Sequence, residues 1–460
     1  MKIPALVAAS AVLLSGCASH TLSGRSRSAA GIISDASVRG HMEFFASDAM
    51  NGRGSGTRDE WIAATYIASQ LRRWGVEPLG DEGGFVQAVE VARTQVNAPP
   101  ILTAQGLRFT HGKEILVQGL SALRVSGPLQ KFQRGATVAA GAVVLLPEGA
   151  GPEAQAATAN AAAVLTIENA QVRSRWDVQA TRPLSLPGRI VALPAQSGGP
   201  ARPTRIVLDR NAHAAMTALA DGAVVSLEAT GSEVKGHTWN AVGRLKGSDA
   251  AMADQVILLT AHLDHLGGNG AGADPIFNGA DDDASGSAAV LELTEALAKG
   301  KRPKRTVIVA WFGSEEAGGY GARYFVERPP APLDRIVANL EFEMIGRADK
   351  AVAPHTLWLT GYERTNLGPE LARHGARLVA DPHPDQNFFQ RSDNIQLARR
   401  GVVAQTVSSY GLHTDYHQPS DDVAHVDIAH MTESIQSMLE PVRWLANGTF
   451  TPEWLPGKRP

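Results

Sequence analysis

The chain is poor in cysteine, since Cys17 is the only one among 460 residues, and this excludes an intrachain disulfide framework. It also lacks a strong charge of either sign, with 43 Lys and Arg against 46 Asp and Glu, and it contains no basic run. This balance argues against an electrostatic nucleic-acid binder. Charged residues make up only 19% of the chain, which also contains 46 glycines and 26 prolines. Such a composition is typical of loop-rich globular proteins rather than of disordered or coiled ones.

The first seventeen residues differ in character from the rest of the chain. An apolar run at 3–14 is too short to span a bilayer and is typical of an export signal. The run leads into LSGC, which resembles the bacterial lipobox, and Ala18 follows it. We therefore predict a lipoprotein signal at 1–17 and a flexible tether at 18–33. Lipidated Cys17 would attach the protein to the periplasmic side of the bacterial outer membrane.

The chain is long enough for two or three domains, and its composition changes along its length. After the tether we predict a main domain in two parts, at 34–97 and 234–450, which are separated by a β-rich insert at 98–233. A tail follows at 451–460. The first part reads as helices around a Gly-rich loop at 47–57. We interpret Arg53 in this loop as part of a surface turn, with a role at the edge of the substrate site as the alternative. The insert carries short apolar runs between turn signals and no cluster of His, Asp or Glu, so no chemistry is assigned to it.

From Gly236 onward, apolar runs alternate with helical segments. We expect strands at 256–261, 306–312, 336–344, 356–360 and 401–407, and helices at 284–299, 367–374 and 427–446. Near-continuous apolar strands separated by helices indicate an α/β fold with a mainly parallel, twisted sheet and helices on both faces. In such folds a functional site forms at the carboxyl ends of the strands.

Six short polar islands follow these predicted strands. They are AHLDHLG (261–267), NGADDDASG (278–286), FGSEEAGG (312–319), EFEMIG (341–346), RSDN (391–394) and DYHQPSDD (415–422). A centre of two metal ions needs a bridging carboxylate, further ligands for each ion and a base that takes a proton from water. The islands contain a candidate for each role, and together they predict a two-metal hydrolase site.

Each acidic island also has a plainer interpretation when it is taken alone. Asp281, Asp282 and Asp283 would repel one another in a buried loop without a cation, yet they also suit an acidic surface loop whose last member caps a helix. Glu315 and Glu316 follow a strand and should point apart, so that one can bind metal while the other moves protons. An isolated pair of this kind is usually a solvated turn.

Three histidines in or near the islands are candidate ligands. His262 directly follows a buried strand, and Asp264 could hold its second ring nitrogen, as metal-bound histidines usually require. His413 and His417 lie around the last polar loop, and either could bind metal, although lone histidines more often do not.

Taken together, the islands resemble one family, the cocatalytic di-zinc exopeptidases of clan MH. This family includes bacterial leucyl aminopeptidases, aminopeptidase Y and glutamate carboxypeptidase. The resemblance covers about 236–446, with the order and spacing of the islands intact. The insert, through GATVAAGAVVLLPEG and AAAVLTIENA, resembles the protease-associated domain that many members carry. The resemblance implies two zinc ions per chain.

For the first zinc ion, the resemblance implies His262 and Glu343 as ligands, with Asp264 as the partner of His262. Asp282 would bridge both ions, and a cis peptide bond would follow it. Family members commonly have Asp where this chain has Glu343, whose longer side chain reaches further. Glu341 lies two residues earlier, on the same face of the strand, and is the alternative ligand.

For the second zinc ion, the resemblance implies Glu316 and His417 as ligands, with Glu315 as the general base. Zinc would lower the pKa of a water between the ions, and Glu315 would take its proton and return it to the leaving amine. His413 matches no ligand position, so we assign it a structural or pocket role. Residues 390–393 are candidate pocket residues, with a polar loop as the plainer interpretation.

We therefore expect an exported zinc aminopeptidase that removes N-terminal residues from peptide substrates. A carboxypeptidase acting on acidic C-termini is the alternative, and Arg391 is the one hint of the cationic pocket it would need. A glutaminyl cyclase, which uses one zinc, is disfavoured by the complete ligand set and by the insert. A receptor-like binding lipoprotein without activity is disfavoured because the implied ligands and base are all present.

Overall fold

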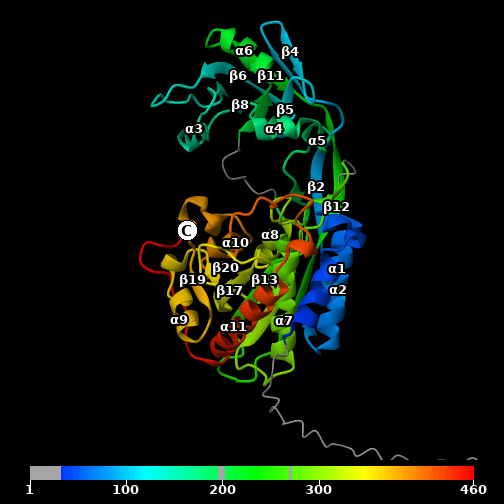
Figure 1. Ribbon diagram of the computed structural model, residues 1–460, viewed down its shortest axis with the longest axis vertical. Helices are drawn as coiled ribbons and strands as arrows, with labels where there is room; N and C mark the ends of the chain where they lie inside the picture. Colours follow the sequence, from blue (N-terminus) through cyan, green and yellow to red (C-terminus); the bar gives the residue numbers. More distant parts are fainter. Residues whose placement is uncertain (1–32, 195–202, 269–271) are drawn as a thin grey trace, which may run out of the picture.

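The computed structural model describes residues 33–194, 203–268 and 272–460, so the predicted signal and almost all of the tether lie outside it. It has two parts, a main domain built on a large mixed sheet and a smaller β-rich module above it (Figure 1). Within the ranges described, no helix combines the length and the apolar character needed to cross a membrane.

The sheet of the main domain has the strand order β19-β18-β20-β17-β13-β16-β12-β2-β9, and β1 also pairs with β12. In chain order the strands are β1 (Glu77–Pro78), β2 (Val86–Val96), β9 (Arg189–Ile190), β12 (Gly231–Leu245), β13 (Val256–His262), β16 (Thr306–Phe312), β17 (Ile336–Phe342), β18 (Leu357–Leu359), β19 (Leu378–Ala380) and β20 (Ala404–Ser408). β13 pairs in parallel with β16 and β17, and β17 pairs in parallel with β20. The expected parallel arrangement therefore holds at the centre of the sheet.

The flanks of this sheet are antiparallel, which makes the sheet mixed. β12 pairs antiparallel with β16 and with β2, and β18 pairs antiparallel with β20. β2 and β12 belong to regions of the chain that the insert separates, so their pairing is non-local and cannot be recognised from the alternation of neighbouring elements.

Helices cover both faces of the sheet, as predicted (Figure 1). They are α1 (Asp35–Phe45), α2 (Arg58–Arg73), α7 (Gly286–Ala298), α8 (Tyr320–Glu327), α9 (Leu367–Arg373), α10 (Asn394–Ala398) and α11 (Ile428–Asn447). Successive residues of β13 face opposite sides. Ile257 and Leu259 pack into the core that includes α1, α7 and α11, while Val256 and Leu258 pack into the core that includes α8 and α10.

The β-rich module has its own sheet, with the order β4-β3-β11-β6-β7-β8-β10-β5. Its strands are β3 (Ile101–Ala104), β4 (Leu107–Thr110), β5 (Ile115–Gly119), β6 (Arg124–Lys131), β7 (Val143–Leu145), β8 (Ala163–Ile167), β10 (Thr204–Leu208) and β11 (Val224–Glu228). Its described helices are α3 (Pro152–Ala157), α4 (Ala170–Ser174), α5 (Trp176–Ala180) and α6 (Arg210–Ala218). A separate apolar cluster that includes Leu102, Val143 and Leu165 forms its core.

The module and the main domain are joined by two long paired strands. β2 and β12 pair from Val86 opposite Ala241 to Val96 opposite Gly231, and they rise together from the main sheet toward the module (Figure 1). The chain returns from the module along β2, where β9 pairs with it. Close to that return, the backbone N–H of Gly188 donates a hydrogen bond to the hydroxyl of Tyr320 at 2.6 Å. The module is thus tied to the first residue of α8.

A buried acid in α7 makes the stability of the fold depend on pH. Glu292 is fully buried, and the nearest ring nitrogen of His41 lies 3.7 Å from its Oε1. Burial raises the pKa of Glu292 from 4.5 to about 7, so the folded protein keeps a proton that the unfolded chain releases. Stability therefore falls as the pH rises from about 4.5 to about 7, by roughly 3 kcal/mol in total.

Glu292→Gln removes this penalty because the amide never ionises. We expect the variant to be more stable than the parent at pH 8 and to lose most of that advantage at pH 5, as measured by the difference in Tm at each pH. Glu295→Gln is the matched control, because Glu295 lies on the same helix and pairs with Lys299. An equal effect of Glu292→Gln at both pH values would contradict the prediction.

Candidate metal centre

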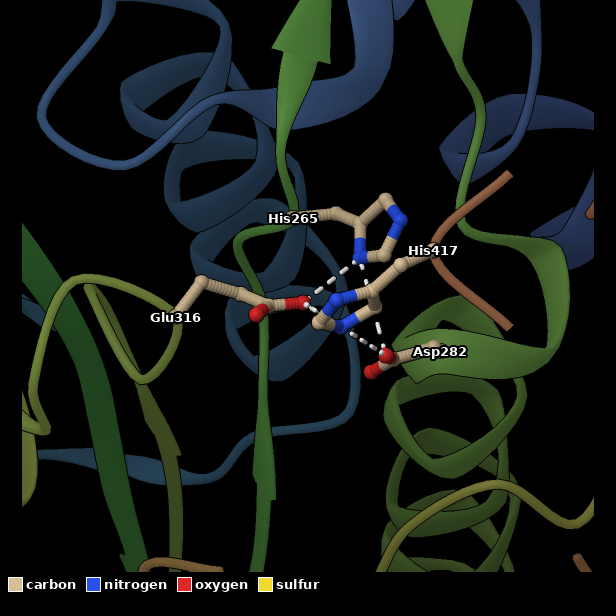
Figure 2. A group of neighbouring side chains, drawn as sticks. All are labelled: His265, Asp282, Glu316 and His417. Carbon is tan, nitrogen blue, oxygen red and sulfur yellow. Dashed lines mark ion pairs between the residues drawn. The ribbon is translucent and has the colours of Figure 1, made fainter. Parts of the chain in front are cut away.

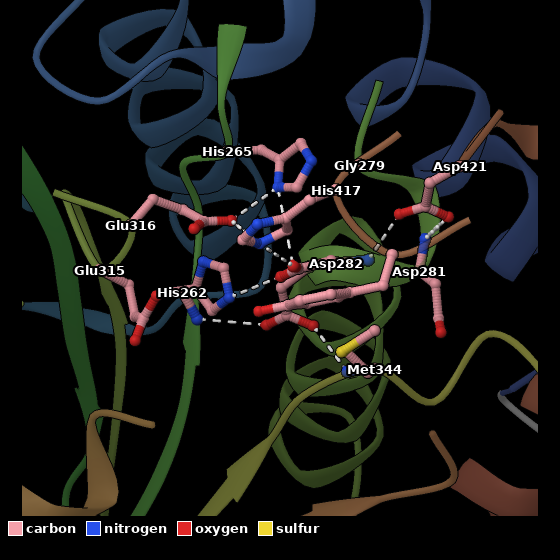
Figure 3. Close-up of polar contacts among 12 residues, drawn as sticks. His262, His265, Gly279, Asp281, Asp282, Glu315, Glu316, Met344, His417 and Asp421 are labelled. Atoms are coloured by element: carbon pink, nitrogen blue, oxygen red, sulfur yellow. Dashed lines mark hydrogen bonds and ion pairs between the residues drawn. The ribbon is translucent and has the colours of Figure 1, made fainter. Parts of the chain in front are cut away.

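The polar islands meet at the carboxyl ends of the central strands. β13 ends at His262, β16 leads to Glu315 and Glu316, and β17 is followed directly by Glu343. Asp282 lies in the turn before α7, and His417 comes from the loop after β20 (Figure 3). The chain therefore brings six of the predicted side chains to one edge of the sheet, as parallel strands allow.

One group of donors consists of His265, Asp282, Glu316 and His417, whose ligand atoms lie within 4.8 Å of one another (Figure 2). Nε2 of His417 lies 3.2 Å from Oδ2 of Asp282 and 3.2 Å from Oε1 of Glu316. Nδ1 of His265 lies 2.8 Å from the same Oε1. All four side chains are directed at one point.

The second group consists of His262, Asp282 and Glu343. Nε2 of His262 lies 3.1 Å from Oδ1 of Asp282 and 4.0 Å from Oε1 of Glu343. Asp282 belongs to both groups, and it uses Oδ1 toward His262 and Oδ2 toward His417. A carboxylate with one oxygen in each group has the geometry of a bridging ligand.

The residues present fit metal ions, because their facing atoms converge without hydrogen-bonding one another. Nε2 of His262, Nε2 of His417 and Oε1 of Glu316 are buried, and among the described residues none has a hydrogen-bond partner of good geometry. Buried polar atoms normally have such partners. Imidazole nitrogens and carboxylate oxygens are the donors that zinc takes in proteins.

Charges in the site are strongly coupled. Burial alone would raise the pKa of Asp282, but the rings of His262 and His417 outweigh it and hold that pKa well below its usual range. Burial likewise opposes the charged form of His417, yet Asp282 and Glu316 raise its pKa to about 10. Burial raises the pKa of Glu343 to about 7 and places that of Glu315 well above its usual range. Bound cations would compensate the charge of these buried acids.

The three consecutive aspartates point in different directions, and the interpretation as an acidic surface loop is wrong because all three are buried. Asp281 accepts a hydrogen bond from the backbone N–H of Gly346, at 2.6 Å. Asp283 accepts from the N–H of Gly286 at 2.9 Å, and so it caps the start of α7. Only Asp282 faces both groups, and the peptide bond that follows it is cis, as the resemblance implied.

Asp264 supports the centre without belonging to either group. Its carbonyl oxygen lies 3.1 Å from Nδ1 of His262, while its Oδ1 lies 3.7 Å from the same nitrogen. The carboxylate accepts hydrogen bonds from the backbone N–H groups of Glu315 and Glu316, at 2.9 and 3.4 Å. Asp264 therefore fixes both the first histidine and the loop that carries the two glutamates. Glu315 and Glu316 then point apart (Figure 3).

Arg53 is not part of a surface turn, since only 1% of it is exposed. Its guanidinium donates hydrogen bonds to the carbonyl oxygens of Leu263, Asn278 and Gly279, at 3.0, 2.7 and 2.9 Å. These carbonyls belong to the two loops that carry His262 and Asp282. Arg53 therefore links the two loops by hydrogen bonds to their main chain.

The remaining predicted residues lie around the centre rather than in it. Glu341 is buried and accepts hydrogen bonds from the backbone N–H of Asn394 and the hydroxyl of Thr406, so the geometry favours Glu343 as the first-ion ligand. His413 lies 2.8 Å from Oδ2 of Asp281 and belongs to neither group. Burial raises the pKa of Asp393 to about 8.

A pocket with a largely apolar and aromatic wall lies beside Glu343, in the donor group that also contains His262. Its walls include Glu343, Arg391 and Ser392, together with the apolar and aromatic side chains Met344, Trp358, Phe388, Tyr410 and Tyr416. The guanidinium of Arg391 lies over the ring of Phe388, 4.9 Å from its centre. Gln390 is exposed and does not line this pocket. The predicted pocket residues are therefore divided between the pocket, the buried acid Asp393 and the surface.

His265 is the member of the groups that the sequence did not predict. It follows Asp264 directly in HLDH, and the second histidine of that island is the only signal in the sequence. Spacing alone does not reveal its role, because its neighbours Asp282 and Glu316 come from other loops.

Comparisons with known proteins agree with this architecture. Residues 240–442 match the family described as Peptidase family M28. An aminopeptidase of Pseudomonas aeruginosa is 36% identical over 115 residues, which are 24% of this chain and 19% of that protein. The chain spans about a fifth of the length of other curated relatives that it matches.

Two solved structures share the fold across nearly the whole chain. The aminopeptidase from Aneurinibacillus sp. strain AM-1 superposes with a TM-score of 0.59 at 16% identity, over 91% of this chain and 95% of its own. The zinc aminopeptidase BSAP from Bacillus subtilis superposes with a TM-score of 0.55 at 17% identity, over 90% of this chain and 96% of its own. The mixed α/β fold is therefore shared with these two aminopeptidase structures.

Proposed function

Residues 240–442 form a domain of peptidase family M28, and on that basis we propose that this chain is a zinc aminopeptidase with two ions in one centre. The observation that carries the proposal is the pair of donor groups that share Asp282. His262 and Glu343 would hold one ion, and Glu316 and His417 the other. The aminopeptidase of Pseudomonas aeruginosa and the two aminopeptidases of similar structure support the choice of aminopeptidase.

The bound ions would supply Lewis-acid chemistry, polarising the peptide carbonyl and lowering the pKa of a water. Glu315 belongs to neither donor group, so its carboxylate is free to take a proton from that water and to give it to the leaving amine. Asp264 keeps Glu315 in place through the hydrogen bond to its backbone N–H.

The charges around the pocket favour the amino end of a peptide. Glu315, Glu341, Glu343 and Asp393 are carboxylic acids in or beside the centre, and Arg391 is the one base in the pocket wall among the described residues. A free α-amine is cationic at neutral pH, so it would favour the ionised form of these acids and would be attracted to them. The aromatic wall of the pocket would accept an apolar side chain of the substrate.

We propose two further properties that the peptidase domain does not require. The module at 98–233 would act as a protease-associated domain, since its return segment reaches Tyr320 beside the Glu315 loop. Cys17 would carry a lipid, on the strength of LSGC, and Ala18 at the next position favours attachment to the periplasmic side of the outer membrane.

The proposed activity is tested with a set of free peptides and their N-acetylated counterparts, followed by mass spectrometry with and without a chelator. We expect loss of single N-terminal residues from the free peptides only, and loss of this activity in the chelator. The residues that are removed fastest would report the preference of the aromatic pocket.

C-terminal trimming of both peptide sets would instead establish a carboxypeptidase, with Arg391 at the pocket as the group that binds the terminal carboxylate. No cleavage by the zinc-loaded protein would refute the peptidase proposal and favour a binding lipoprotein.

A further inference from the structure

We infer that His265 is a direct ligand of the second zinc ion, so that the two metal sites are unequal. The second site would be closed by four protein donors, while the first would have three donors and an open position. This inference rests on the proposed zinc centre and assigns a function to a histidine for which the family resemblance implies none.

The ring of His265 is held in place by packing. The side chain is fully buried, and its backbone N–H donates to the carbonyl of Arg53 at 3.0 Å. A Cβ on Gly279 would lie 2.5 Å from Cγ of His265, so the glycine provides the room that the ring occupies. The imidazole thus has a fixed orientation before any ion binds.

The buried ring has no hydrogen bond that would satisfy it. Among the residues that the structure describes, neither nitrogen of His265 has a hydrogen-bond partner of good geometry. Its Nδ1 lies 2.8 Å from Glu316 and 3.8 Å from Asp282, on the side where His417 also points (Figure 2). A buried imidazole without hydrogen bonds is unfavourable, and an ion between these donors would remove that cost.

The spacing of the four donors suits a tetrahedral ion. With metal–ligand bonds of about 2.0–2.2 Å, neighbouring donors of a tetrahedral site lie roughly 3.3–3.6 Å apart. The distances from His417 to Asp282 and Glu316 are both 3.2 Å, and those from His265 are 3.8 and 2.8 Å. These values lie on either side of the expected one, so small adjustments would complete the site.

The first site differs because it has only His262, Asp282 and Glu343. Zinc sites with four protein ligands are typically structural, whereas sites with three keep a position for water or substrate. The ion at the closed site would therefore bind more tightly and exchange more slowly. The ion at the open site would be the one that is lost first and that contacts the substrate.

The inference is tested by titrating the chelator-stripped full chain with Zn²⁺ in competition with a chelating dye. We expect two unequal binding constants, and His265→Ser should weaken the tighter one by about 100-fold or more while the weaker one changes much less. His413→Ser is the matched control, since His413 is a nearby histidine that pairs with Asp281 but belongs to neither group. It should weaken the tighter constant far less than His265→Ser does.

His265→Cys gives a signature that a purely structural role would not produce. A cysteine that touches Co²⁺ creates a thiolate-to-cobalt charge-transfer band in the near ultraviolet, and Cys17 is the only native cysteine, so the parent protein is the blank. We expect this band with the first equivalent of Co²⁺. Absence of the band with Co²⁺ bound, or unchanged constants in His265→Ser, would overturn the inference. Unequal constants in a chain that cleaves no peptide would instead refute the proposed function alone.

Discussion

Glu315→Gln is expected to lower kcat by about 10²–10⁴-fold while both metal ions remain bound. The amide has nearly the size of the carboxylate but cannot take a proton from water. Glu315 belongs to neither donor group, and its backbone N–H keeps its hydrogen bond to Asp264 in the variant. The measurement is kcat on a chromogenic N-terminal amide, together with metal content by plasma mass spectrometry.

The neighbouring residue provides the matched control for this substitution. Glu316→Gln changes an adjacent carboxylate in the same way, but Glu316 faces His265 and His417, so we expect that variant to lose metal. Equal metal loss in both variants would show that Glu315 is a ligand and not a base. Retained activity in Glu315→Gln would exclude it as the group that moves the proton.

Asp282→Asn is expected to weaken the binding of both ions, each by about two orders of magnitude or more. Asp282 is the only residue common to the two donor groups, with one oxygen toward His262 and the other toward His417. An amide carries no charge and offers one oxygen instead of two. Activity should disappear together with the metal, and isothermal titration with Zn²⁺ measures both effects on affinity.

Asp281→Asn separates this effect from a general disturbance of the acidic turn. Asp281 is also buried, but its carboxylate accepts from the backbone N–H of Gly346 and faces His413 instead of the donor groups. An asparagine can still accept that backbone hydrogen bond, so the variant should bind two ions. Loss of only one ion in Asp282→Asn would mean that this residue does not bridge.

The central strands and the location of the site could be predicted from the sequence because both depend on local pattern. Apolar runs such as 256–261 and 306–312 are long enough to indicate buried strands, and polar residues that follow parallel strands necessarily meet at one edge. That rule places the islands at one edge, whereas the choice of His262, Asp282, Glu316, Glu343 and His417 as ligands came from the family resemblance. The structure brings these five side chains together.

The features that were not predicted depend on contacts between distant parts of the chain. Arg53 is buried because its partners are main-chain carbonyls of two other loops, and a sequence does not show where carbonyls point. His265 joins a donor group only because Gly279, in another loop, leaves room for its ring. The choice between Glu341 and Glu343 depends on backbone donors near Asn394 that are not apparent from strand periodicity.

The pairing of β2 with β12 also has a consequence for how this architecture could have arisen. The chain leaves the main sheet at Val96 and re-enters it at the directly opposed Gly231, so the module occupies the position of a hairpin loop. Loop length changes the free energy of closing such a hairpin only slowly. A gene could therefore gain, exchange or lose the whole module at this position while the register of the peptidase sheet stayed the same, with β9 as the part of the module that would have to be replaced.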